Sequence, residues 1–454
     1  MNEFAQKHTD MPSIFHITAD TNCTLFRYGE KVLALSTGVE SVISFPPGRQ
    51  KLKFVSEKYN DVIQELVLNI PSDDYEDFIE VKLREPEIEF KKGVFDDDGN
   101  WYSPDWKTLR RASKNLSRVI VHKHCVEINT QAFFDCKLQS VDLPQGLKNI
   151  GPYAFEHCHF LEQISIPESV EEISISAFSY CVNLKTVVLP NGITFIPDSC
   201  FWHTGVESII IPSSVKEIKS AAFAGSQLKR ISFAEGLQVI EDRAFKQCEK
   251  LEEIVFPSTL KSLGESSFAD CYSLSKVNCQ GYYVMSKPSI PYGIKNIPQY
   301  CFANTNITTI TLPSTVENIS QCAFAGCSSL KSAELYEGLK NIGVQAFYGC
   351  KSLSSIRLPK GVKTIEREAF SYCKSLDNVY IPSSVTQIGK DALLFVKPFI
   401  EKYYEDYDDN IYKDYEFNPE FHITYYVDKG CSSHFRQLIG EGIFKTCGAK
   451  IIEV

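Results

Sequence analysis

One aromatic position recurs along most of this chain at an almost constant interval. Ten steps separate eleven phenylalanines, and nine of them are 22 or 23 residues long while one is 34. Leu393 continues the series another 23 residues on. Such a period predicts coils that stack on one another. The eleven are Phe133, Phe155, Phe178, Phe201, Phe223, Phe245, Phe268, Phe302, Phe324, Phe347 and Phe370.

Other positions keep the same register, and one repeat reads L-x-x-I-x-I-P-x-x-V-x-x-I-x-x-x-A-F-x-x-C. The segment I-x-I alternates as a strand with one buried face does, and the Pro after it ends the strand. Each repeat offers about six apolar side chains worth roughly 1.5–3 kcal/mol apiece when buried, but it is too short to bury them alone. We therefore expect a mainly β solenoid with a continuous core and one parallel sheet. Before Phe178 the apolar set and its Pro are Leu161, Ile164, Ile166, Pro167, Val170 and Ile173.

The repeat resembles the BspA-like leucine-rich repeat family, which is bacterial for the most part. The stretches "IP-x-S-V-x-x-I" at Ile211–Ile218 and Ile381–Ile388 carry the resemblance most clearly, and it extends from Leu116 to Leu393. It implies a right-handed leucine-rich-repeat solenoid of about twelve turns of 22–23 residues. It also implies a non-enzymatic binding protein with a role in cell-surface attachment or adhesion.

Four segments follow from these patterns: a small β-sandwich-like domain at 1–86, a linker and cap hairpin at 87–115, the solenoid at 116–397 and a C-terminal cap at 398–454. The first segment contains short antiparallel strands with polar breaks. Its stretch Pro46–Ile70 resembles a PEGA-like β domain through Pro47, Gly48, Leu52, Phe54 and Tyr59.

The segments that flank the solenoid look like covers for its ends, since open strand edges invite aggregation. "YSPDWKTL" resembles the hairpin that precedes these repeats in the family, although Trp106 stands where the family has Gly. In the acidic, Tyr-rich stretch Glu401–Phe417, the spacing of Tyr403, Tyr407 and Ile411 is consistent with a helix, and a projecting loop is the alternative. We expect a last strand at His422–Gly430, a capping helix at Ser432–Phe444 and a closing strand in "AKIIEV".

The chain has sixteen cysteines, and eight of them lie three residues after a repeat Phe, where other turns have Ser or Thr. A position that accepts all three residues needs no pairing, so we expect free structural thiols, which suit a reducing compartment. "HKHC" (His122, His124, Cys125) and "HCH" (His157, Cys158, His159) lack the spacing of structural zinc sites, and "DDDGN" lacks the rest of a calcium loop. We predict neither metal nor cofactor.

Charge and motifs exclude several function classes. The net charge of −10 argues against nucleic-acid binding, and no apolar run is long enough for a transmembrane segment. The first residues do not resemble a secretory signal, so the chain as written is expected in the cytoplasm, and at the cell surface or secreted if a leader was removed. No nucleophile elbow, phosphate loop, zincin or dinucleotide motif occurs, so we predict no enzyme activity. We expect a monomer.

Solenoids bind partners on their long regular surfaces, and two candidate surfaces follow. The first is the outward face of the strands, which carries Thr186, Val188, Ser208, Ile210, Arg230, Glu253 and Val255. The second is the long step, an eleven-residue insertion between Leu274 and Met285, with Tyr282, Tyr283 and Tyr292 as aromatic anchors, together with Trp202 on another loop. The apolar residues could instead simply suit strands, and the insertion could be without function. The partner is a protein or a glycan, and an intracellular scaffold without a surface role is the alternative.

Overall fold

The computed structural model describes residues 13–19, 23–27, 30–35, 41–45, 48–56, 63–70, 76–81, 93–280, 288–393, 399–405, 411–417, 424–439 and 450–454. The chain divides into two compact units, Met1–Val94 and Phe95–Val454. Each unit is described by itself.

The first unit contains two small sheets. The order β3-β2-β5-β6 is antiparallel throughout, whereas in the order β4-β1-β7 the pair β1 and β7 is parallel. The hairpin β5–β6 spans most of the stretch that resembles a PEGA-like domain, and Tyr59 lies outside the described residues, so that resemblance stays a prediction. The strands are β1 (Ser13–Ala19), β2 (Cys23–Arg27), β3 (Glu30–Leu35), β4 (Ser41–Phe45), β5 (Gly48–Ser56), β6 (Ile63–Ile70) and β7 (Glu76–Val81).

A hairpin covers the first edge of the solenoid. After β8 (Val94–Phe95), strands β9 (Trp101–Tyr102) and β10 (Thr108–Arg111) pair antiparallel, and β10 then pairs in parallel with β12 of the first turn. Trp106 takes the turn position where the family has Gly, and its φ of 63° is the left-handed conformation that glycine adopts freely. The N–H of Trp106 donates to the carbonyl of Ser103 at 2.9 Å, so the turn closes without the glycine.

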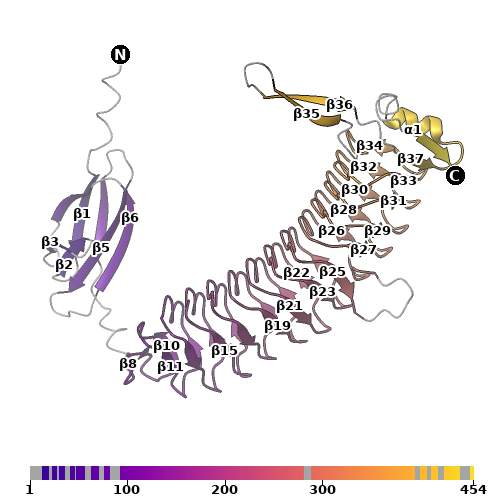
Figure 1. The fold of residues 1–454 in the computed structure, drawn as a ribbon. Coiled ribbons are helices and arrows are strands. Elements are labelled where there is room, and N and C mark those ends of the chain that lie inside the picture. The colour runs from indigo at the N-terminus through magenta and orange to yellow at the C-terminus, as the bar shows by residue number, and fades with distance from the viewer. Residues whose placement is uncertain are drawn as a thin grey trace, which may run out of the picture. The chain divides into compact units, whose positions relative to one another are not determined.

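The I-x-I segments form parallel strands that stack along the solenoid (Figure 1). Their pairing is interrupted at three places, so the expected single parallel sheet is a row of four ladders. In each strand the middle residue faces the core and its neighbours face outward, as the alternation predicts. The strands are β11 (Arg118–Ile120), β13 (Ser140–Asp142), β15 (Gln163–Ser165), β17 (Thr186–Val188), β19 (Ser208–Ile211), β21 (Arg230–Phe233), β23 (Glu253–Phe256), β25 (Lys276–Cys279), β27 (Thr309–Thr311), β29 (Ser332–Glu334), β31 (Ser355–Arg357) and β33 (Asn378–Ile381).

A second row of parallel strands, each of two residues, runs along another side of the coil. This row was not predicted from the sequence. Two proline positions interrupt this row, since β16 does not pair with β18 and β24 does not pair with β26. Pro197 and Pro298 follow the strand in the later turn of each break, where other turns donate a backbone N–H such as that of Ser174 to Ile150 at 2.9 Å. The strands are β12 (Glu127–Ile128), β14 (Asn149–Ile150), β16 (Glu172–Ile173), β18 (Phe195–Ile196), β20 (Glu217–Ile218), β22 (Val239–Ile240), β24 (Ser262–Leu263), β26 (Asn296–Ile297), β28 (Asn318–Ile319), β30 (Asn341–Ile342), β32 (Thr364–Ile365) and β34 (Gln387–Ile388).

The repeat phenylalanines form the core of the stack. All eleven rings are buried, and neighbouring rings lie nearly parallel with centroids 4.5–5.6 Å apart. The prediction of a β solenoid is confirmed, and the stack has about thirteen turns rather than twelve.

The cysteines after each Phe connect adjacent turns as free thiols. Cys158 Sγ donates to the carbonyl of Phe133 at 3.0 Å, and Cys350 Sγ donates to that of Phe324 at 3.3 Å. Five more thiols make the same bond at 3.0–3.1 Å, namely Cys181, Cys248, Cys271, Cys327 and Cys373. All fourteen cysteines whose side chains the structure describes are free, and thirteen of them are buried.

The C-terminal cap contains a hairpin where a helix or loop was expected. Strands β35 (Phe399–Glu405) and β36 (Ile411–Phe417) pair antiparallel. Beyond them β37 (Thr424–Val427) adds to β33, β38 (Lys450–Glu453) adds to β37, and α1 (Ser432–Ile439) follows β37 along the chain. The two strands and the helix therefore lie within the ranges expected for them, and the helix begins at the expected Ser432. Of the described helices, none has the length and hydropathy to cross a membrane.

Candidate functional site

The outward face of the first sheet carries two large apolar side chains side by side. Val188 on β17 is 58% exposed and Ile210 on β19 is 73% exposed, and both follow a residue that faces the core. They occupy the same position of adjacent turns. Val255 on β23 is only half-buried and lies two strands beyond Ile210, with Ser232 between them. The exposed apolar pair is therefore Val188 and Ile210, and Val255 is separate from it.

The parallel row of outward residues is polar and continuous. Thr186 pairs with Ser208, Ser208 with Arg230 and Arg230 with Glu253 in the strand register. Glu253 accepts a hydrogen bond from Asn278 Nδ2 at 2.9 Å. These four side chains line the apolar pair on one side, as a polar rim does at a protein interface.

Two of the aromatic residues proposed as anchors, Trp202 and Tyr292, are among the described residues. Trp202 lies on the turn after Phe201 and is half-buried rather than exposed, because its ring packs against Tyr180 at 5.0 Å and against His203 at 5.1 Å. Tyr292 is 40% exposed. Tyr282 and Tyr283 lie outside the described residues.

The insertion begins later than the sequence spacing indicated. Strand β25 pairs in register with β23 through Cys279, and Leu274 is buried like its counterparts in other turns. Ile290 is buried again, and Ser289 N–H donates to the carbonyl of Thr311 at 2.8 Å. The described chain therefore keeps the contacts of the repeat through Gln280, whose N–H donates to the carbonyl of Phe256 at 2.8 Å, and has them again at Ser289.

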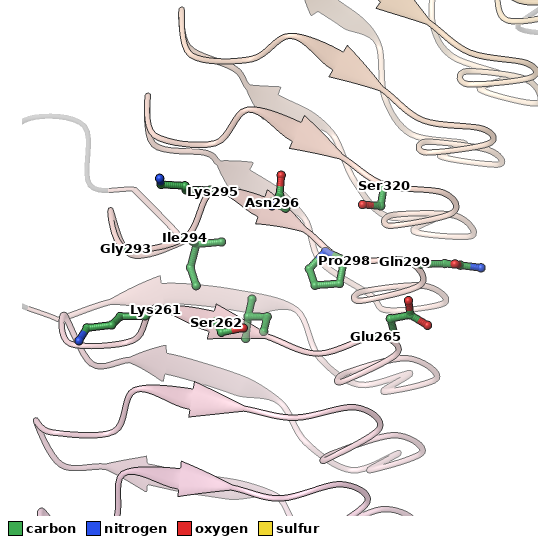
Figure 2. A pocket seen from close by; sticks show the side chains of 11 residues that line it. Lys261, Ser262, Glu265, Gly293, Ile294, Lys295, Asn296, Pro298, Gln299 and Ser320 are labelled. Atoms are coloured by element: carbon green, nitrogen blue, oxygen red, sulfur yellow. The ribbon is translucent and has the colours of Figure 1, made fainter.

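A cleft of about 660 Å³ opens beside Pro298. Figure 2 shows it between the turn that carries Ser262 and the turn that carries Asn296. Phe268 and Phe302 still stack at 5.6 Å across the same two turns, so the solenoid is continuous on its aromatic side. The cleft is a local gap in the second strand row.

A second cleft of about 490 Å³ lies on the outward face of the first sheet, near the C-terminal end of the stack. It lies where β29 and β31 are not paired, although their turns are consecutive; β13 and β15, and β25 and β27, are unpaired in the same way. Ala333 stands where the neighbouring turns have Ile310 and Ile356, and Tyr336 stands where most turns have Pro. This cleft was not predicted from the sequence. Ala333 and Tyr336 are the two departures from the repeat that indicate it. Its lining also includes Glu334, Leu335, Glu337, Arg357, Leu358, Lys360 and Tyr380.

A charged arrangement fixes the side chains at one end of this second cleft. The Arg357 guanidinium lies over the Tyr380 ring, 3.9 Å from its centroid. The Tyr380 hydroxyl donates to the carboxylate of Asp428, which raises the pKa of that hydroxyl. Hydrogen bonds from Ser383 and from Tyr380 lower the pKa of Asp428 to about 2. Asp428 on the cap therefore connects it to Tyr380 and Ser383 of the last turn.

The histidine and cysteine clusters have structural contacts. Cys125 is buried and its Sγ donates to the carbonyl of Glu127 at 3.2 Å, while the His122 ring packs on Trp106 at 4.4 Å. His157 stacks on Tyr180 at 4.7 Å. Throughout the described part of the chain, no group of three or more His, Cys, Asp or Glu side chains is arranged to hold a metal ion.

The sequence matches the model of the BspA type leucine-rich repeat region over residues 111–229, 194–286 and 295–403. Together these matches cover more than half of the chain. The chain belongs to this family. No match is found among the curated proteins.

Several solved bacterial structures are similar to this chain at low sequence identity. A leucine-rich cell surface protein of Faecalibacterium prausnitzii is 22% identical over 67% of this chain and 91% of its own, with a TM-score of 0.43. A leucine-rich repeat protein of Bacteroides ovatus is 23% identical over 80% and 98%, with a TM-score of 0.47. The pneumococcal vaccine antigen PcpA is 19% identical over 80% and 98%, with a TM-score of 0.42.

Proposed function

We propose that this BspA-type repeat protein is a non-enzymatic binding module that recognises a protein partner with the outward face of its first sheet. Solenoids commonly use their extended surfaces in this way, and a regular stack offers many equivalent positions for contacts. Among the described residues no nucleophile, general base and orienting group come together as an active site would need. Binding therefore suits this surface better than catalysis.

The proposed binding surface is based on the exposed pair Val188 and Ile210. An isolated apolar side chain on a surface needs no explanation, but two neighbours that are both more than half exposed form a small apolar centre. The polar row Thr186, Ser208 and Arg230 lies directly beside it. An apolar centre with a polar rim is the usual anatomy of a protein interface.

The test replaces both apolar side chains with a charge. The variant Val188→Asp/Ile210→Asp should lose a partner that the wild type retains in affinity capture from the native host, because burial of two carboxylates in an interface is unfavourable. The matched control Ser165→Asp/Ser232→Asp changes exposed residues of the same row on the flanking strands. Equal capture by all three proteins would contradict the proposed surface. A glycan array with the same variants distinguishes a carbohydrate partner.

The family resemblance leads us to expect a role at the cell surface. The second candidate function is that of an intracellular scaffold. The free thiols favour the second, because thirteen buried and unpaired cysteines fit a reducing compartment. Fractionation of the native host cells separates the two locations. Recovery with the cell envelope supports attachment, and recovery with the cytosol supports the scaffold.

A further inference from the structure

The C-terminal cap ends the first sheet in a strand whose far edge is free. In the order β31-β33-β37-β38, strand β38 pairs with β37 and with no other described strand. Val454 N–H donates to the carbonyl of Val427 at 2.9 Å, and alternate residues of a strand bond to opposite sides. The main-chain N–H and C=O groups of Ile451 and Glu453 therefore point away from β37, and no described residue bonds them.

The same edge is apolar on the outward face of the sheet. Tyr425 and Val427 are buried toward the core, so Tyr426 and its partner in the strand register, Ile452, face outward. Ile452 is 43% exposed, and Val454, two residues further on, is 58% exposed. An edge strand with exposed apolar side chains and free main-chain groups is a template for pairing with another chain.

This edge is complementary to itself when two copies run antiparallel. With Ile452 opposite Ile452 of the second copy, Ile451 of each copy lies opposite Glu453 of the other, and their free main-chain groups bond in both directions. The two Ile452 side chains then form a close cross-strand pair on the outward face. Lys450 lies opposite Val454 of the second copy, and the aliphatic stem of the lysine covers that valine.

The helix of the cap leaves room for a second copy at this edge. Strands β37 and β38 extend the first row by two strand spacings, about 9.6 Å beyond β33. Helix α1, with a diameter of about 10 Å, lies at the end of the second row, where His434 Nε2 is 3.4 Å from the carbonyl oxygen of Val385. Its Phe435 ring packs against Tyr425 of β37 at 5.2 Å. The helix and the edge strand therefore end at a comparable height.

The other free edges that the structure describes in the first row do not offer such room. The edges at the three interruptions face the next turn of the same stack. Strand β11, at the first end, pairs only with β13, but the second row there continues past β12 through β10, β9 and β8. These three strands project beyond β11, so a second solenoid would meet the hairpin before it reached that edge.

We propose that two copies of this chain associate through antiparallel pairing of their β38 strands. The two first sheets then continue into one another across a twofold axis at Ile452, an isologous contact of the kind that most homodimers use. Because β38 is short, the interface is small, and we expect a dissociation constant on the order of micromolar. The proposal replaces the monomer expected from the sequence, and it is independent of the Val188–Ile210 face.

The test is sedimentation velocity of the full chain at concentrations from about 1 to about 100 µM, over which the wild type should change from monomer to dimer. Ile452→Lys places like charges opposite each other on the twofold axis and should weaken the dimer at least about tenfold. Ile451→Pro removes an N–H that faces away from β37, so it should weaken the dimer in the same way while β38 stays paired with β37.

The matched control is Ile120→Lys, because Ile120 is also an exposed isoleucine on an edge strand, at the other end of the stack. This variant should dimerise as the wild type does. A wild type that stays monomeric up to about 100 µM would overturn the proposal, and so would a dimer that both β38 variants retain or that Ile120→Lys abolishes. Urea denaturation checks the fold of each variant, and Ile452→Lys, a surface change, decides the test if the proline disturbs the cap.

Discussion

At the scale of single residues, the repeat depends on left-handed backbone conformations, and the residue types at those positions do not indicate them. In every turn from Phe133 to Phe370, the residues two before and two after the Phe have φ between 51° and 75°, and most of them are not glycine. A left-handed conformation costs such residues about 1 kcal/mol. The cost is offset because their N–H groups donate to the next turn, as Tyr153 N–H does to Ile175 and His157 N–H does to Ser179, both at 3.0 Å.

Buried thiols predict a specific pH dependence of stability. Burial raises the pKa of Cys136 and of Cys301 to about 12, and that of Cys327 to about 11. In the unfolded chain a thiol titrates near about 8.5, so above that pH the unfolded state releases protons that the folded state keeps. The stability that these thiols contribute is therefore present below about pH 8.5 and is lost as the pH rises toward their folded pKa values.

We expect the midpoint of urea unfolding to fall markedly between about pH 8 and about pH 10, with up to about 1.4 kcal/mol lost per pH unit for each protected thiol. The measurement is a series of denaturation curves in a reducing buffer. Replacement of Cys301 and Cys327 by Ala should lower the starting stability but also flatten the slope. A midpoint that does not change over this range would contradict the burial of the thiols.

At the scale of elements, most turns are joined to the next by the first sheet and by the short second row, and the left-handed residues around Phe bridge turns where a strand pair is missing. The first sheet was predictable, because I-x-I alternates and Pro ends it. The second row was not, since strands of two residues have no period to detect. The hairpin β35–β36 was not predicted, because the spacing of Tyr403 and Ile411 was consistent with a helix or a projecting loop, whereas the two residues lie on separate strands that pair antiparallel.

The candidate site was predictable only in part. The outward position of Val188 and Ile210 follows from the strand alternation, so the sequence places them on one face. The half-burial of Trp202 depends on Tyr180 of the preceding turn, a contact that no local pattern contains. The cleft at Arg357 lies beside an unformed strand pair, and only Ala333 and Tyr336, which depart from the repeat, indicate it in the sequence.

Close packing between turns gives a matched pair of glycine substitutions. Gly338 and Gly146 both lie nine residues before a repeat Phe. A Cβ at Gly338 would lie 1.7 Å from the carbonyl oxygen of Ser314, whereas one at Gly146 would meet no atom within 4 Å. We expect Gly338→Ala to cost about 1–3 kcal/mol in chemical denaturation, and Gly146→Ala to change stability by less than about 0.5 kcal/mol. Equal effects of the two substitutions would be inconsistent with turns stacked in this register.

At the scale of the whole molecule, the second unit is a one-dimensional stack in which each turn contacts mainly its neighbours. The β9–β10 hairpin closes one end, and β37, β38 and α1 close the other. Capped ends are what a solenoid needs to remain soluble, since each exposed turn would otherwise present open edges. The turns between the caps should then be interchangeable units.

The most direct test of this account is the removal of one whole turn compared with the removal of half a turn. Deletion of Phe223–Ala244 takes out one repeat of 22 residues and joins Ala222 to Phe245, which preserves the register. Deletion of Phe223–Phe233 takes out eleven residues and breaks it. By circular dichroism and urea denaturation, we predict that the full-turn variant remains folded with one cooperative transition and that the half-turn variant unfolds or aggregates. If the two deletions were equally disruptive, the description of residues 116–393 as a stack of equivalent turns would be wrong.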